Sequence, residues 1–127
     1  MTRERVETSG APQAMGPYSQ AIATESLVFC AGQVGLDAAT GALVEGGIEA
    51  QAKRALQNLG AVLDAGGSSF ADVVKTTCYL AEIADFAAFN EVYGGFFPDP
   101  PPARSTFAVK ELPLGARIEI EAIALRR

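Results

Sequence analysis

The segment 48–65, IEAQAKRALQNLGAVLDA, constrains the fold of this chain more than any other. Apolar side chains recur in it at spacings of three and four, which predicts a helix with an apolar stripe along one side. The stripe consists of Ile48, Ala52, Ala55, Leu56, Leu59, Val62 and Leu63. Gly66 and Gly67 follow at once and predict the end of the helix. Such a helix must bury its apolar side, so the rest of the chain has to supply a second layer.

Strand-like segments on both sides of this helix can supply that layer. We expect strands over 3–7, 19–23, 27–32, 72–83, 104–110 and 117–125, and a second helix over 85–97. The order β-β-β-α-β-α-β-β predicts an α+β fold in a single domain, residues 1–127, with one six-stranded antiparallel or mixed sheet and both helices on one face. The other face would then need a cover, and self-association is the expected one.

Composition and charge exclude several classes of protein. Among 127 residues, 49% are apolar and 20% charged, which is typical of a globular domain. The net charge is −5 and the basic residues are scattered, so we expect no nucleic acid partner. No apolar run is long enough to cross a bilayer, and the first ten residues, MTRERVETSG, do not form a signal sequence. We therefore expect no membrane partner and a cytoplasmic protein.

The chain contains no histidine, which removes Ser-His-Asp triads, Cys-His dyads and histidine-ligated metals. Cys30 and Cys78 lie inside apolar runs and are expected to be small buried side chains in a reducing compartment. The glycines do not have the spacing of a phosphate-binding loop. We expect neither a metal nor a cofactor.

Arg104 is the first candidate for a binding residue. It follows the proline-rich segment PDPPP, 98–102, at the start of an expected strand. Most arginines lie on the surface, and this one could be no exception. Prolines restrict the backbone, however, and a guanidinium forms two parallel hydrogen bonds with a carboxylate. A positioned cation that binds a small carboxylate is the alternative.

Alternation in RIEIEAIAL, 117–125, places Glu119 and Glu121 on one face of the last strand and an apolar row on the other. The two glutamates are either solvated or partly buried, and a partly buried carboxylate can position or deprotonate water. Tyr18, in a Gly-Pro loop, is either a core anchor or a pocket hydroxyl. Asn90, inside the second helix, would bind a neighbouring loop or a ligand. These groups suit a small organic anion but do not identify a reaction.

The chain resembles the RidA/YjgF family, also called the L-PSP endoribonuclease-like family. The similar segments are AMGPYSQA (14–21), CAGQVGLD (30–37), VVKTTCYL (73–80), FNEVY (89–93), PPARSTFAV (101–109) and RIEIEAIALRR (117–127), in the family's order. The resemblance implies a chorismate-mutase-like fold and a homotrimer whose sheets form a central barrel, with clefts between neighbouring subunits. It also implies the hydrolysis of reactive 2-imino acids, such as 2-iminopropanoate and 2-iminobutanoate, to 2-keto acids and ammonia without a cofactor.

By the same resemblance, Arg104 would bind the substrate carboxylate and Glu119 would hold or activate the attacking water. Tyr18 and Asn90 would line the cleft, Gly32 would allow a close backbone approach, and backbone groups of Thr106 would orient the imine.

The chain departs from the family pattern at two places. Ala31 stands where many members have serine, and Thr106 stands where many deaminating members have cysteine. Because Ala31 lacks the serine hydroxyl, the rate of hydrolysis and the substrate preference stay open. Two other functions also remain. One is an endoribonuclease or translation inhibitor, which the net negative charge and the lack of histidine disfavour. The other is a binding module that holds a small carboxylate without turnover.

Overall fold

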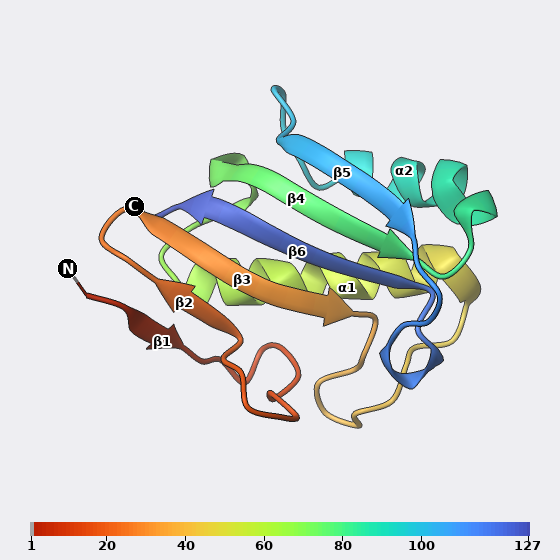
Figure 1. Ribbon diagram of the computed structural model, residues 1–127, viewed down its shortest axis with the longest axis horizontal. Coiled ribbons are helices and arrows are strands. Elements are labelled where there is room, and N and C mark those ends of the chain that lie inside the picture. The colour runs from red at the N-terminus through yellow and green to blue at the C-terminus, as the bar shows by residue number, and fades with distance from the viewer. Residues whose placement is uncertain (1) are drawn as a thin grey trace.

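The computed structural model describes residues 2–127 as one mixed six-stranded sheet with two helices (Figure 1). The strands follow the order β1-β2-β3-β6-β4-β5 across the sheet, and only β4 and β5 pair in parallel. Their bounds are β1 Glu4–Val6, β2 Ala21–Ala23, β3 Leu27–Val34, β4 Val73–Leu80, β5 Ala103–Ala108 and β6 Ile118–Leu125. The helices are α1, Gly47–Ala65, and α2, Phe86–Gly94, with short 3-10 turns at Phe70–Asp72, Ile83–Asp85 and Pro113–Gly115.

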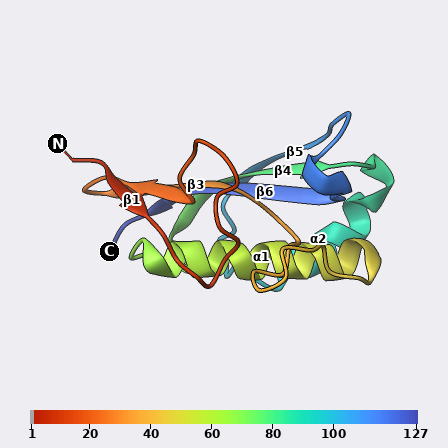
Figure 2. The same ribbon diagram turned by 90° about the horizontal axis from the view of Figure 1, so that it is seen from below.

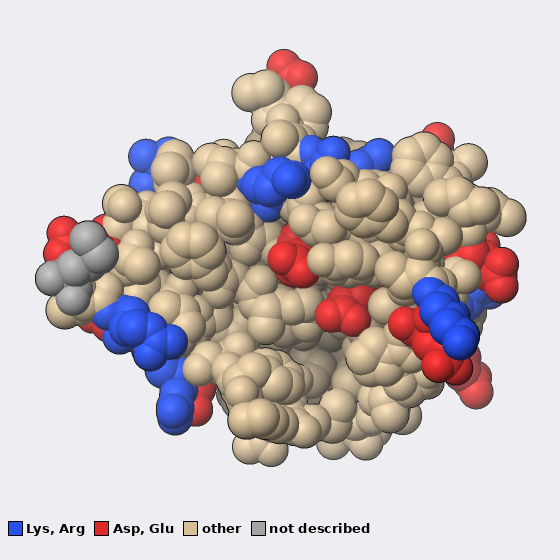
Figure 3. Space-filling model, viewed as in Figure 1, with Lys and Arg blue, Asp and Glu red and all other residues tan. Residues whose placement is uncertain are grey.

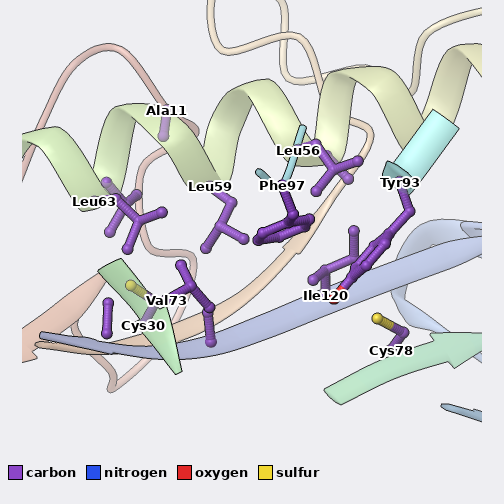
Figure 4. Packing of buried hydrophobic residues seen from close by; sticks show 14 of the residues in the cluster. Ala11, Cys30, Leu56, Leu59, Leu63, Val73, Cys78, Tyr93, Phe97 and Ile120 are labelled. Atoms are coloured by element: carbon purple, nitrogen blue, oxygen red, sulfur yellow. The ribbon is translucent and has the colours of Figure 1, made fainter. Parts of the chain in front are cut away.

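Both helices cover the same face of the sheet, as the sequence predicted (Figure 2). The whole apolar stripe of α1 is buried, and its leucines face Val73 and Ile120 across the core, where Tyr93 and Phe97 also pack (Figure 4). Burial of this stripe is the main force that holds the helix layer on the sheet.

The register of β6 confirms the predicted alternation. Ile118, Ile120, Ala122 and Ala124 are buried under the helices, whereas the residues between them point to the opposite face. On β3, the pairing with β6 shifts between Cys30 and Gln33, which marks a bulge at Ala31 and Gly32.

The observed elements differ from the expected ones mainly at their ends. Helix α2 ends at Gly94 instead of residue 97, because Gly94 and Gly95 interrupt it before Phe96 and Phe97, whose side chains pack against Phe70. Strand β4 ends at Leu80 instead of residue 83, where the chain turns into the 3-10 segment before α2.

The sheet face opposite the helices is open and largely apolar. Phe29, Phe107 and Leu125 are exposed there, and Figure 3 shows mostly uncharged side chains on this face, with acidic side chains near its middle and basic ones above them and at its edges. Exposed apolar area of this kind is typical of a surface that binds a partner. Within residues 2–127, no helix is both long and apolar enough to cross a membrane.

Candidate functional site

Glu119 lies on the open face of β6, half-buried at a cavity of about 340 Å³ that Tyr18 and Gly32 also line. The bulge of β3 places Gly32 directly against the glutamate. A Cβ atom at Gly32 would lie 2.8 Å from Cδ and 2.9 Å from Cγ of Glu119, and would overlap its Oε2. A side chain at this position would therefore displace the Glu119 carboxylate from where it lies.

The surroundings of Glu119 favour its protonated form. Burial raises the pKa of this carboxyl above its usual range, and the like charge of Glu121, two residues along the same face, raises it further. Glu121 is itself bound, because the hydroxyl of Tyr79 donates a hydrogen bond of 2.8 Å to its Oε1. That bond, followed by burial, raises the pKa of Tyr79 to about 12, so the phenol keeps its proton. Glu119 is thus a carboxylate with increased basicity.

Tyr18 is exposed at the mouth of the same cavity. Its hydroxyl oxygen accepts a hydrogen bond of 3.3 Å from the backbone N–H of Met15, which leaves the phenolic proton free for a ligand. Of the two readings of the sequence, a pocket hydroxyl is therefore the one that fits. The smaller cavity adjoins a wider, polar hollow of about 940 Å³ that includes Arg3 and Arg5 but not Glu119.

Gln20 is a structural residue that the sequence analysis missed. Its side chain is buried and ties down the loop that carries Tyr18: Nε2 donates to Pro12 O at 2.8 Å, and Oε1 accepts from Thr8 N at 2.7 Å. A glutamine directly before an apolar strand was the only available signal. Ala31 also lines the cavity, where it contributes a methyl group and no hydroxyl.

Arg104 lies elsewhere, on the helix side of β5. It pairs in register with Thr76, whose hydroxyl hydrogen-bonds Tyr93 of α2 at 2.7 Å. The guanidinium carbon lies 4.7 Å from the ring centre of Tyr93, 5.4 Å from that of Phe86 and 5.8 Å from that of Phe89. These rings hold the cation by cation–π attraction. No acidic group among the described residues forms an ion pair with it, so its N–H donors stay free.

Asn90 and Thr106 lie on the same side as Arg104. Thr106 pairs with Cys78, whose side chain is buried under the helices, and Asn90 follows Phe89 on α2. Asn90 Oδ1 and Thr106 Oγ1 are both buried without a hydrogen-bond partner. Buried polar atoms without partners are rare in folded proteins, so these two call for an explanation that the packing of one chain does not give. The neighbouring loop does not satisfy Asn90 Oδ1, which favours the ligand alternative for this residue.

The six candidate residues therefore form two groups that face opposite sides of the sheet. We call Tyr18, Gly32 and Glu119 the carboxylate cluster, and Asn90, Arg104 and Thr106 the guanidinium cluster. Glu119 pairs with Tyr79 on the open face, whereas Arg104 pairs with Thr76 on the helix face, and β4 lies between the two strands. The two clusters do not converge within one chain.

The two cysteines are shielded by burial. Cys30 and Cys78 are buried, and burial raises the pKa of their thiols to about 12 and about 11. No group of three or more acidic, cysteine or histidine side chains within residues 2–127 could hold a metal ion.

Comparison with known proteins places the chain in a family. The family model "Endoribonuclease L-PSP" matches residues 8–126. A chloroplastic Reactive Intermediate Deaminase A of Arabidopsis thaliana is 51% identical over 96% of this chain, which spans 65% of that protein. A 2-iminobutanoate/2-iminopropanoate deaminase of Mus musculus is 48% identical over 98% of this chain and 92% of its own length.

Solved structures agree with this fold. A crystal structure of a putative endoribonuclease from Thermotoga maritima has a TM-score of 0.94 and 48% identity, covering 98% of each chain. A structure of E. coli TdcF with bound serine has a TM-score of 0.93 and 38% identity, covering 98% of this chain and 99% of that one. The family match and these similarities extend over nearly the whole chain. The protein therefore belongs to the Endoribonuclease L-PSP family, also called RidA/YjgF.

Proposed function

We propose that the protein hydrolyses reactive 2-imino acids, such as 2-iminopropanoate, its enamine tautomer 2-aminoacrylate, and 2-iminobutanoate, to 2-keto acids and ammonia. The observation that carries this proposal is the pair of complementary clusters: an unpaired guanidinium beside two unsatisfied polar atoms, and a basic carboxylate at a cavity. The names of the relatives support the same reaction, and serine, bound to TdcF, is a small molecule with a carboxylate.

The active site is proposed to lie between copies of the chain. Because the two clusters face opposite sides of the sheet, the guanidinium cluster of one copy can meet the carboxylate cluster of the next. Repeated contacts of this head-to-tail kind close into a ring, and we propose a homotrimer with three such clefts. The exposed apolar side chains of the open face, Phe29, Phe107 and Leu125, would be covered in this assembly.

Within the cleft, the forked guanidinium of Arg104 would bind the substrate carboxylate through two hydrogen bonds. Asn90 Oδ1 and the backbone at Thr106 would orient the imine nitrogen, and the free proton of Tyr18 would be donated to the ligand. Glu119 would accept a proton from a water molecule whose oxygen forms a bond to C2 of the imine. Glu119 would return that proton to the nitrogen of the resulting carbinolamine and then accept the hydroxyl proton, so that the C=O bond forms as the C–N bond breaks and ammonia leaves the keto acid. A protonated imine is already electrophilic, so orientation and one positioned water supply most of the catalysis.

A coupled assay tests the reaction. A threonine dehydratase releases 2-iminobutanoate, and the purified protein should accelerate the release of 2-oxobutanoate beyond the spontaneous rate. Arg104→Ala should lower kcat/KM roughly 100-fold, because the substrate carboxylate loses its charged partner. Lys53→Ala, which removes an exposed cation from α1, is the matched control and should behave like the wild type. Full activity of Arg104→Ala would refute the assignment.

The name of the family favours one other function, the cleavage of RNA. Cleavage of RNA at physiological salt that is lost in Arg104→Ala or Glu119→Gln would support it over deamination. Binding of a keto acid without any turnover of the imine would instead support a binding module. We also propose a cytoplasmic location, although the Arabidopsis relative is described as chloroplastic.

A further inference from the structure

The cavity beside Glu119 has an apolar wall that hydrolysis of the smallest imino acids does not require. Among the side chains that line it, Glu119 is the only charged one, whereas Pro12, Met15, Pro113 and Leu114 provide apolar surface. Its volume of about 340 Å³ holds roughly ten water-sized groups. The single methyl group of 2-iminopropanoate would leave most of this space empty.

Leu114 and Met15 are exposed to an unusual degree for large apolar side chains. Leu114 is 59% and Met15 66% exposed, and both border this cavity. Met15 is fixed relative to the candidate site, because its N–H donates to the hydroxyl of Tyr18. The two side chains therefore present apolar area to whatever occupies the cavity next to Tyr18 and Glu119.

The backbone of Leu114 adds an independent observation. With φ 61° and ψ 18°, it is the only non-glycine residue with positive φ within residues 2–127. Leucine rarely adopts this left-handed conformation, and residues held in it against their preference cluster at ligand-binding sites. Here the turn Pro113–Gly115 holds the leucine side chain at the cavity, where glycine or asparagine would suit the backbone better.

We propose that Met15 and Leu114 form a subsite for the apolar side chain of the substrate, and that the enzyme prefers imino acids with branched or longer aliphatic side chains, such as the one derived from leucine. This inference rests on the proposed function and specifies its substrate class. Each methylene group that moves from water into an apolar subsite contributes about fourfold to kcat/KM. Three additional carbons, only partly enclosed by an open cavity, should give a preference of about tenfold over the imine derived from alanine.

The test compares two imines that an L-amino-acid oxidase generates in situ from leucine and from alanine. Hydrolysis is measured as the loss of semicarbazone when semicarbazide competes for each imine. Wild-type protein should favour the leucine-derived imine about tenfold. Leu114→Asn, which keeps a side chain of similar size and tolerates the left-handed backbone, should remove most of this preference, because hydrolysis of the leucine-derived imine falls much more than that of the alanine-derived imine. Leu114→Met, which keeps an apolar side chain, should retain the preference, and Met15→Gln should weaken it.

Equal effects of Leu114→Asn on both imines, or no effect on either, would overturn the subsite and leave the deaminase function intact. If neither imine were hydrolysed faster than in buffer, the proposed function would fail separately. In that case, calorimetric titration with 4-methyl-2-oxopentanoate and with pyruvate compares the affinities for the two keto acids, which tests the subsite without turnover. Tighter binding of the branched keto acid that Leu114→Asn abolishes supports the subsite, and equal binding of the two keto acids refutes it.

Discussion

Arg104 and Glu119 face opposite sides of the sheet, so the proposed cleft needs two chains, and a mixture of two inactive variants tests this requirement. Arg104→Ala removes the cation from one side of every cleft, and Glu119→Gln removes the carboxylate from the other. Each variant alone should lose roughly 100-fold or more in kcat/KM. In a mixed assembly, however, one cleft can combine the intact Arg104 of one chain with the intact Glu119 of the other.

The size of the restored activity follows from the geometry of a closed ring. A trimer that contains both variants has one junction at which both lesions are absent, whichever variant is in the majority. Mixed trimers should therefore regain about one third of wild-type kcat with an unchanged KM. The two chains are coexpressed with different affinity tags, and consecutive purification on both tags isolates the mixed assemblies. Keto-acid release from the imine is then compared with that of each parent variant.

Two results would refute this reasoning. Mixed trimers as inactive as their parents would mean that both residues act within one chain. Sedimentation equilibrium that gives a monomer for the active wild type would remove the cleft between copies altogether. Trimers assembled from two differently tagged copies of Arg104→Ala are the control for any effect of the tags, and they should stay inactive.

Three further predictions concern single sites. Because deprotonated Glu119 is the proposed base and its pKa is raised, kcat/KM should fall as the pH drops through that raised pKa. Glu121→Gln removes a like charge and should shift this fall in kcat/KM to lower pH, as measured in a pH–rate profile corrected for spontaneous hydrolysis. Gly32→Ala should lower kcat/KM at least tenfold while the melting temperature changes little, because the new Cβ displaces the half-buried Glu119 carboxylate and not the core. Cys30 and Cys78, with thiol pKa values raised to about 12 and about 11, should react with a thiol reagent at pH 8 only after denaturation; rapid modification of the native protein would contradict their burial.

The fold was predictable because its strongest signals are local. The apolar stripe of α1 and the alternation of β6 depend only on neighbouring residues in the chain, and both are confirmed by burial. The ends of α2 and β4 were less predictable. They depend on where Phe96 and Phe97 pack and on where the chain turns toward α2, and both are tertiary effects.

The candidate site was predictable in its residue types but not in its division into two clusters. Arg104 and Glu119 stood out as a cation after prolines and a carboxylate on an alternating strand. The faces to which they point, however, depend on how β5 pairs with β4 and β4 with β6, which is set by contacts between segments distant in the sequence. Nothing in the letters "LPLG" indicated that Leu114 takes a left-handed conformation, since glycine and asparagine are the residues that usually signal one.

The division of the site between faces also has a genetic consequence. Each chain would contribute to the two clefts on either side of it, so a subunit with lesions in both clusters would silence both neighbouring clefts and not just one. Alleles of this kind should act dominantly when coexpressed with the wild-type gene, because defective subunits enter most of the assemblies. Alleles that prevent folding should instead be recessive, since their products never join a ring. The same separation of Arg104 and Glu119 that leaves a lone chain without a complete site would thus determine which mutations the normal copy can mask.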